Sequence, residues 1–186
     1  MRMTLPNVLT WIRILAIPLV VVIFYAPISW NGPGAAILFA LAGVTDYLDG
    51  YLARRLGQTS KFGAFLDPVA DKLMVATALV LIVQHNPHSY LAIVAAIIIG
   101  REITVSALRE WMSEVGARGR VAVTYFAKWK TTAQIFGISF ILYERPLLSI
   151  DTYSVGIVLL LVAAGLTILS MIDYLRAAWP VIRKVD

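Results

Sequence analysis

Six long apolar segments, separated by short polar ones, fill almost the whole of this 186-residue sequence. A helix needs about 20 mostly apolar residues to cross a bilayer. The segments of about that length are residues 8–27, 34–54, 65–84, 89–111, 124–143 and 153–175. A content of 60% hydrophobic residues and a mean hydropathy of +0.80 exclude an ordinary soluble domain. We therefore predict an all-α polytopic membrane protein, with six transmembrane helices around a cytosol-facing polar cavity, in a single domain that spans residues 1–186.

The distribution of basic residues predicts the orientation of these helices. If the amino terminus is cytosolic, the outer loops are residues 28–33, 85–88 and 144–152, and of the 16 Lys and Arg residues only Arg145 lies there. Basic residues concentrate on the cytosolic side of membrane proteins, so we expect both termini on that side. The net charge of +5 then forms a basic cytosolic face suited to anionic membrane lipids and phosphorylated substrates. A nucleic-acid partner is not expected, because it would explain the charge but not the helices.

Four aspartates interrupt the apolar pattern within residues 46–71, DYLDGYLARRLGQTSKFGAFLDPVAD. At about 100° per residue, Asp46 and Asp49 lie about 60° apart on one helix, and Asp67 and Asp71 about 40° apart on the next. Two antiparallel helices would therefore bring all four carboxylates into one cleft. Carboxylates are hard ligands that favour Mg²⁺ or Mn²⁺, and the chain has no cysteine. Because unpaired carboxylates are costly in a membrane and usually mark a working site, the stretch predicts bound divalent cations.

The same acids admit two other interpretations. Asp46 would pair with Arg54, and Asp67 with Lys72, if they served only as structural ion pairs. Alternatively, intramembrane carboxylates form the ion path of a divalent-cation transporter. The position of the acids at the inner ends of two helices, away from the bilayer midplane, disfavours the transporter.

Small residues and an arginine lie between the acids, and this combination suits the close approach of a diphosphate. The complete pattern resembles the signature of the CDP-alcohol phosphotransferases, D-x2-D-G-x2-A-R-x8-G-x3-D-x3-D. Every fixed position is matched, by Asp46, Asp49, Gly50, Ala53, Arg54, Gly63, Asp67 and Asp71. The resemblance implies two divalent ions, Mg²⁺ or Mn²⁺, held by the four aspartates, with Asp71 as general base. It also implies a homodimer and a cytidine-nucleotide site that includes Gly50, Ala53, Arg54 and Gly63.

The amino-terminal segment PNVLTWIR places Asn7, Thr10 and Arg13 on roughly one face of a helix that enters the membrane. One interpretation is a helix start whose arginine reaches the lipid interface. The segment also resembles the amino-terminal pattern of the same family, which implies that Asn7, and with less support Thr10, lies near the nucleotide diphosphate.

Basic residues in the second half of the chain suggest a site for a second phosphorylated substrate. Arg101 and Arg109 are eight residues apart, about 80° around one helix, so they are expected to point towards a common cleft. The alternative is that Glu102 and Glu110 are simply their ion-pair partners. Lys130 opens the fifth apolar segment and completes the expected acceptor-phosphate group.

Residues 101–116 and 128–134 resemble a particular bacterial branch of the family. Its members transfer the phosphatidyl group of CDP-diacylglycerol to the 1-hydroxyl of sn-glycerol 3-phosphate and release CMP. The resemblance implies this reaction, and it implies a multi-pass protein of the bacterial inner membrane with a cytosolic active site. Inositol phosphate or serine as acceptor remains an alternative. An intramembrane prenyltransferase also uses aspartate pairs for Mg²⁺-diphosphate, but it does not require the G-x2-A-R between them.

Overall fold

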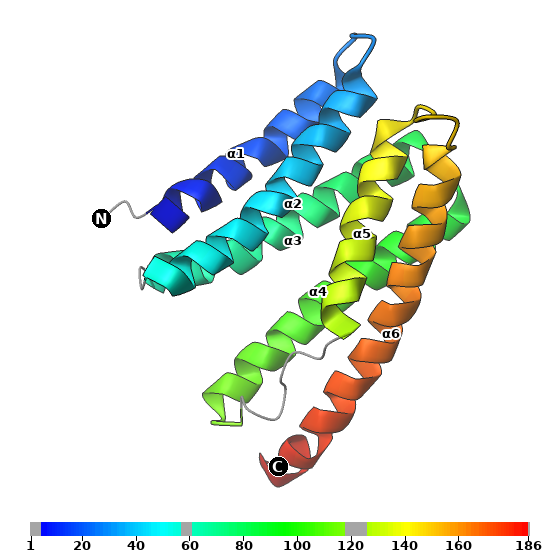
Figure 1. Ribbon diagram of the computed structural model, residues 1–186. Coiled ribbons are helices and arrows are strands. Elements are labelled where there is room, and N and C mark those ends of the chain that lie inside the picture. Colours follow the sequence, from blue (N-terminus) through cyan, green and yellow to red (C-terminus); the bar gives the residue numbers. More distant parts are fainter. Residues whose placement is uncertain (1–4, 57–60, 118–125, 186) are drawn as a thin grey trace.

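The computed structural model describes the backbone of residues 5–56, 61–117 and 126–185. Side chains are described from Val8 onward, with gaps at residues 46–62, 64, 118–128 and 184–186. Within these ranges the chain forms six helices, which confirms the all-α prediction (Figure 1). They are α1 (Leu5–Tyr25), α2 (Asn31–Leu56), α3 (Lys61–His85), α4 (Ser89–Glu114), α5 (Phe126–Tyr143) and α6 (Thr152–Val185).

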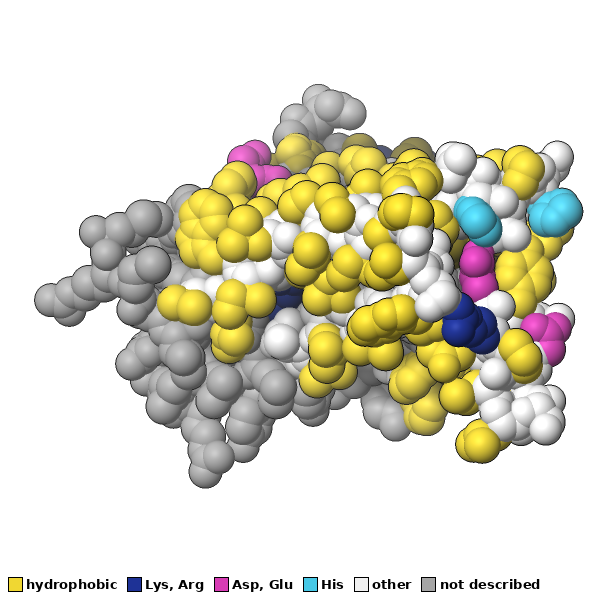
Figure 2. Space-filling view, turned by 90° about the horizontal axis from the view of Figure 1, so that it is seen from above, with side chains coloured by type: hydrophobic (Ala, Val, Ile, Leu, Met, Phe, Trp, Pro, Cys, Tyr) yellow, Lys and Arg dark blue, Asp and Glu magenta, His cyan; other side chains and the backbone are white. Residues whose placement is uncertain are grey.

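Three of the described helices are long and apolar enough to cross a membrane. The described segments long and apolar enough to cross a bilayer are Val8–Tyr25, Ser89–Glu114 and Thr152–Arg183, and α2 contributes a shorter apolar stretch, Asn31–Thr45. Large apolar side chains face outward along the helices, for example Leu15 in α1, Ile93 in α4 and Leu169 in α6. Figure 2 shows hydrophobic side chains along most of one described face, with both histidines and several charged side chains at one end. This surface is suited to lipid, so the protein is a polytopic membrane protein.

Helix boundaries differ from the expected ones where local sequence signals are weak. The last helix, expected over residues 153–175, continues to Val185 with Pro180 inside it. The third helix, expected over residues 65–84, begins earlier, at Lys61, and contains Pro68. Asp67 therefore lies inside α3 and does not cap it.

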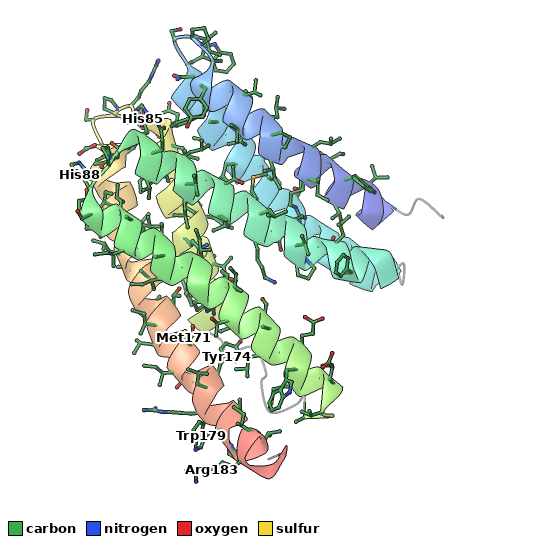
Figure 3. The ribbon with its side chains drawn as sticks, turned by 180° about the vertical axis from the view of Figure 1, so that it is seen from behind. His85, His88, Met171, Tyr174, Trp179 and Arg183 are labelled. Atoms are coloured by element: carbon green, nitrogen blue, oxygen red, sulfur yellow. The ribbon has the colours of Figure 1, made fainter. Side chains whose placement is uncertain are left out.

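The six helices pack as two groups that meet along α2 and α5. Helices α1, α2 and α3 contact one another, α6 contacts α4 and α5, and the groups join through α2 with α5 and α3 with α4. In Figures 1 and 3 the two groups diverge towards the end that carries the chain termini, called here the terminal end. The main apolar core includes Phe39, Leu79, Ile98 and Ile138. A second, smaller cluster of Val105, Met112, Tyr174 and Ala178 joins α4 to α6.

Candidate functional site

The acidic motif is divided between two neighbouring helices, as the sequence predicted. Asp46 and Asp49 lie in α2, Asp67 and Asp71 lie in α3, and these two helices contact each other. The side chains of Asp46, Asp49, Gly50, Ala53 and Arg54 lie outside the described residues. Their part in the site therefore stays a prediction that rests on the motif.

Two side chains of α1 contact the two aspartates of α3. The Thr10 hydroxyl donates a hydrogen bond to Asp67 Oδ1, and Arg13 Nη1 lies 2.5 Å from Asp71 Oδ1. Both donors are deeply buried, with exposed fractions of 1% for Thr10 and 2% for Arg13. The Asp71 side chain is 40% exposed. Helix α1 thus positions both aspartates through these contacts, and the Asp71 carboxylate remains partly exposed.

This contact corrects one expectation for Arg13 and leaves one open for Asn7. Arg13 does not reach the lipid interface, because its side chain is buried against Asp71. A buried guanidinium needs an anionic partner more than it needs an apolar surface. The Asn7 side chain lies outside the described residues, and Gly63 is buried near the start of α3.

The residues at this site fit a divalent cation in their chemistry. Asp67 and Asp71 lie one helical turn apart and supply oxygen ligands of the type that Mg²⁺ and Mn²⁺ prefer. Among the residues with described side chains, no group of three or more candidate ligands is assembled. Helix α2, which carries the other two aspartates of the motif, contacts α3, and a metal site formed by all four aspartates stays a prediction.

A second charged cluster lies between α4, α5 and α6. Arg101 belongs to the buried stripe of α4, which runs through Ile98, Arg101 and Val105. Its Nη1 atom lies 2.5 Å from Glu102 Oε1, and Lys130 Nζ lies 2.8 Å from the same oxygen. Arg101 Nη2 also donates a hydrogen bond of 3.2 Å to Ser170 Oγ. The structure thus brings Arg101 and Lys130 together around Glu102, and it confirms Glu102 as the ion-pair partner that the sequence offered for Arg101.

Arg109 occupies a different environment on the same helix. Its guanidinium carbon lies 5.4 Å from the centre of the Tyr174 ring, and its side chain is exposed. Figure 3 labels Tyr174 on the terminal-end half of α6. Arg109 is still near enough for its charge to act on Lys130, so it borders the cluster and does not join its ion pairs.

Ser170 is a member of this cluster that the sequence did not indicate. It lies in a long apolar helix, and serine is common in such helices for packing reasons alone. Its hydroxyl also donates to the carbonyl of Thr167 at 2.9 Å, within the same helix. Glu102 carried a clearer signal, because a carboxylate beside an arginine in an apolar helix requires a partner.

One cavity, between α3 and α4, borders the cation cluster. A cavity of about 140 Å³ between α3 and α4 is lined by Lys72 and Glu102 together with apolar side chains. Lys72 directly follows Asp71 in the chain, and Glu102 is the shared partner of Arg101 and Lys130. The cavity therefore places Lys72, the residue after Asp71, on the same surface as Glu102 of the cation cluster.

The fold and the site together define a helical membrane protein with paired carboxylates and buried cations inside its bundle. The chain belongs to the CDP-alcohol phosphatidyltransferase family, whose model matches residues 3–171. A protein of Pseudomonas fluorescens named CDP-diacylglycerol–glycerol-3-phosphate 3-phosphatidyltransferase is 51% identical over 96% of this chain and 91% of its own length. Proteins with the same name from Shigella flexneri serotype 5b and from Escherichia coli K12 are each 48% identical, over 96% of both chains.

Proposed function

We propose that the protein transfers the phosphatidyl group of CDP-diacylglycerol to the 1-hydroxyl of sn-glycerol 3-phosphate, with release of CMP. The observation that carries this proposal is the near-full-length similarity to proteins named for that reaction. The presence of both a carboxylate pair and a cation cluster supports it, because the reaction joins a diphosphate donor to a phosphorylated acceptor. The carboxylates suit the diphosphate donor through bound metal ions, and the cations suit the phosphorylated acceptor.

The donor is assigned to the motif between α2 and α3. Members of the family generally depend on a divalent metal ion, and we assign two such ions, Mg²⁺ or Mn²⁺, to Asp46, Asp49, Asp67 and Asp71. When bound, they would neutralise charge on the diphosphate and on the departing CMP. Asn7, Gly50, Ala53, Arg54 and Gly63 are assigned to the cytidine nucleotide.

In the proposed reaction, the 1-hydroxyl oxygen of the acceptor attacks the β-phosphorus of CDP-diacylglycerol. A new P–O bond forms to glycerol 3-phosphate, the P–O bond to CMP breaks, and the hydroxyl proton passes to the Asp71 carboxylate. A free aspartate has a pKa of about 3.9 and is a weak base. Positioning of the hydroxyl must therefore contribute much of the rate.

The acceptor phosphate is assigned to Arg101, Arg109 and Lys130. Arg101 and Lys130 are 5% and 3% exposed, and buried cations attract a phosphate more strongly than solvated ones do. This charge favours a phosphorylated acceptor over serine. The charge of the cluster does not distinguish glycerol 3-phosphate from inositol phosphate. We assign glycerol 3-phosphate because the similar proteins are named for it.

We place the protein in the inner membrane of a bacterium, with both termini and the active site in the cytosol. The basic residue distribution supports this orientation, and the similar proteins come from bacteria. By family resemblance we also propose a homodimer in contact with membrane lipids.

The test is CMP release by the full-length protein purified in detergent micelles. CDP-diacylglycerol and Mg²⁺ are supplied with glycerol 3-phosphate, inositol phosphate or serine, and Asp71→Asn serves as the inactive variant. Release that requires glycerol 3-phosphate, stops on chelation with EDTA and is lost in the variant would support the proposal. Release with another acceptor would reject the assigned acceptor. Metal uptake into vesicles without CMP release would instead support a transporter.

A further inference from the structure

Glu102 is the one carboxylate among described residues that contacts both buried cations of the acceptor cluster. Arg101 Nη1 and Lys130 Nζ approach the same oxygen, Oε1, from two different helices. Arg101 is further tied to α6 through Ser170. Glu102 thus lies at the centre of a contact that joins α4, α5 and α6.

The cluster retains hydrogen-bond donors that these contacts do not use. Arg101 Nε is buried and has no hydrogen-bond partner among the described residues. An ammonium group has three N–H donors, and the ion pairs described for Lys130 use one of them. Since an unsatisfied buried donor is costly, such donors indicate a place for an anionic ligand beside Glu102.

The charges of the cluster match one class of ligand. Arg101 and Lys130, together with Arg109 at the border of the cluster, are positive and Glu102 is negative, so these four residues carry a net charge of +2. A phosphate monoester carries a charge of about −1.5 to −2 at neutral pH. When no ligand is bound, Glu102 also reduces the repulsion among the three cations.

We propose that Glu102 is a positioning residue that holds Lys130 and Arg101 ready for the phosphate monoester of the acceptor. Its carboxylate fixes both cations in one geometry and sets the charge of the cluster to match a dianion. Glu102 acts through the two cations and does not itself bind the phosphate. This inference rests on the acceptor site assigned in the proposed function.

The experiment compares the full-length wild-type protein with Glu102→Gln, which keeps the shape and removes the charge. Glu102→Asp keeps the charge on a shorter side chain. Glu110→Gln is the matched control, because Glu110 lies on the same helix and is exposed. CMP release is measured while glycerol 3-phosphate and CDP-diacylglycerol are varied separately, which gives a KM for each substrate and a kcat.

We expect Glu102→Gln to raise the KM for glycerol 3-phosphate about tenfold or more, since hydrogen bonds to charged groups are among the strong ones. The KM for CDP-diacylglycerol should stay near the wild-type value, and kcat should fall less than the acceptor KM rises. Glu102→Asp should recover part of the acceptor affinity, and Glu110→Gln should match the wild type. An unchanged or lower acceptor KM in Glu102→Gln would overturn the proposal, as would an equal effect on both substrates.

A measurement without turnover separates this proposal from the proposed function. Inorganic phosphate should raise the thermal unfolding temperature of the wild-type protein in micelles, and raise it less for Glu102→Gln. If phosphate stabilises the wild type selectively but no CMP is released, the proposed reaction is wrong and the role of Glu102 stands. If phosphate affects both proteins equally, that role is rejected. Should Glu102→Gln fail to fold, the acceptor KM of Glu102→Asp decides, and a wild-type value rejects the proposal.

Discussion

Thr10 and Arg13 give the aspartates of α3 a fixed orientation. Each belongs to the buried face of α1, and each contacts a carboxylate more than 50 residues away in the chain. Arg13 is almost fully buried while Asp71 is partly exposed, so packing restricts the guanidinium more than the carboxylate. Both donors thus limit the positions available to side chains assigned to catalysis.

Arg13→Gln should reduce CMP release about 100-fold, because a displacement of a reacting group by about 1 Å can cost that much. The protein should also lose about 1–3 kcal/mol of stability with the charged hydrogen bond to Asp71. Steady-state assays and thermal unfolding in micelles check the two effects. Arg183→Gln is the control, since Arg183 is exposed and stacks on Trp179. Activity near the wild-type level in Arg13→Gln would show that Asp71 does not need this contact.

Asp151 has a separate, structural role before the start of α6. Its carboxylate accepts a hydrogen bond from the Ser154 hydroxyl and one of 3.1 Å from the backbone N–H of Tyr153. Chiefly the bond from Ser154 holds the pKa of Asp151 below its ordinary value. The carboxylate therefore stabilises the fold above the ordinary pKa, near 3.8, and this contribution disappears as the pH falls through the lower folded value.

Asp151→Ala should lower the unfolding temperature slightly at neutral pH, and the difference should vanish in acid. A difference that persists below the folded pKa would contradict this role.

At the scale of elements, α5 and α6 contribute Lys130 and Ser170 to the charged cluster beside α4, and these two helices pack with their backbones close together. A Cβ atom placed on Gly156 would lie 2.7 Å from Ile141 Cγ1 and 2.9 Å from both the Gly137 carbonyl oxygen and the Ile141 backbone nitrogen. Small residues allow such close approach between membrane helices. The position of Lys130 relative to Ser170 therefore depends on this glycine contact further along the same helix pair.

Gly156→Ala should push α5 from α6 and cost about 1–3 kcal/mol, as overpacking generally does. We also expect a higher KM for glycerol 3-phosphate, because Lys130 and Arg101 would no longer meet in the same geometry. Gly165→Ala is the matched control in α6, since a Cβ there meets nothing within 4 Å. Thermal unfolding and substrate kinetics measure both effects. Equal behaviour of the two variants would show that the close contact is not needed.

At the scale of the whole molecule, successive helices run in alternating directions between the two ends of the bundle (Figure 1). His85 and His88 lie at the turn between α3 and α4, opposite the terminal end, and Trp179 and Arg183 lie at the terminal end of α6 (Figure 3). The 34 residues of α6 make a helix of roughly 50 Å at 1.5 Å per residue. This exceeds a hydrocarbon core of about 30 Å, so α6 extends beyond the core when it crosses the membrane.

The proposed orientation can be tested with single cysteines, because the chain has none of its own. Both His88 and Ser113 are exposed, at opposite ends of α4. In intact spheroplasts, a membrane-impermeant maleimide should label His88→Cys and not Ser113→Cys. Permeabilisation should make Ser113→Cys reactive, which serves as the control for its accessibility. The reverse pattern would place the termini outside the cell.

Much of the fold followed from the sequence because local properties decide it. Runs of about 20 apolar residues form helices in a membrane, where every backbone polar group must be paired within its own segment. The acidic motif also defined its own helical faces, and it placed Asp67 and Asp71 correctly in one helix. Single-domain organisation and the roles of the α2 aspartates remain predictions.

Only the tertiary structure decided which charged groups meet. Arg13 faces Asp71, Lys130 shares Glu102 with Arg101, and Ser170 contacts Arg101 across 69 residues. No local periodicity specifies such partners, because they depend on the rotation and depth at which separate helices pack. The sequence by itself therefore determined the helices and the motif, and helix packing determined how the charges are paired.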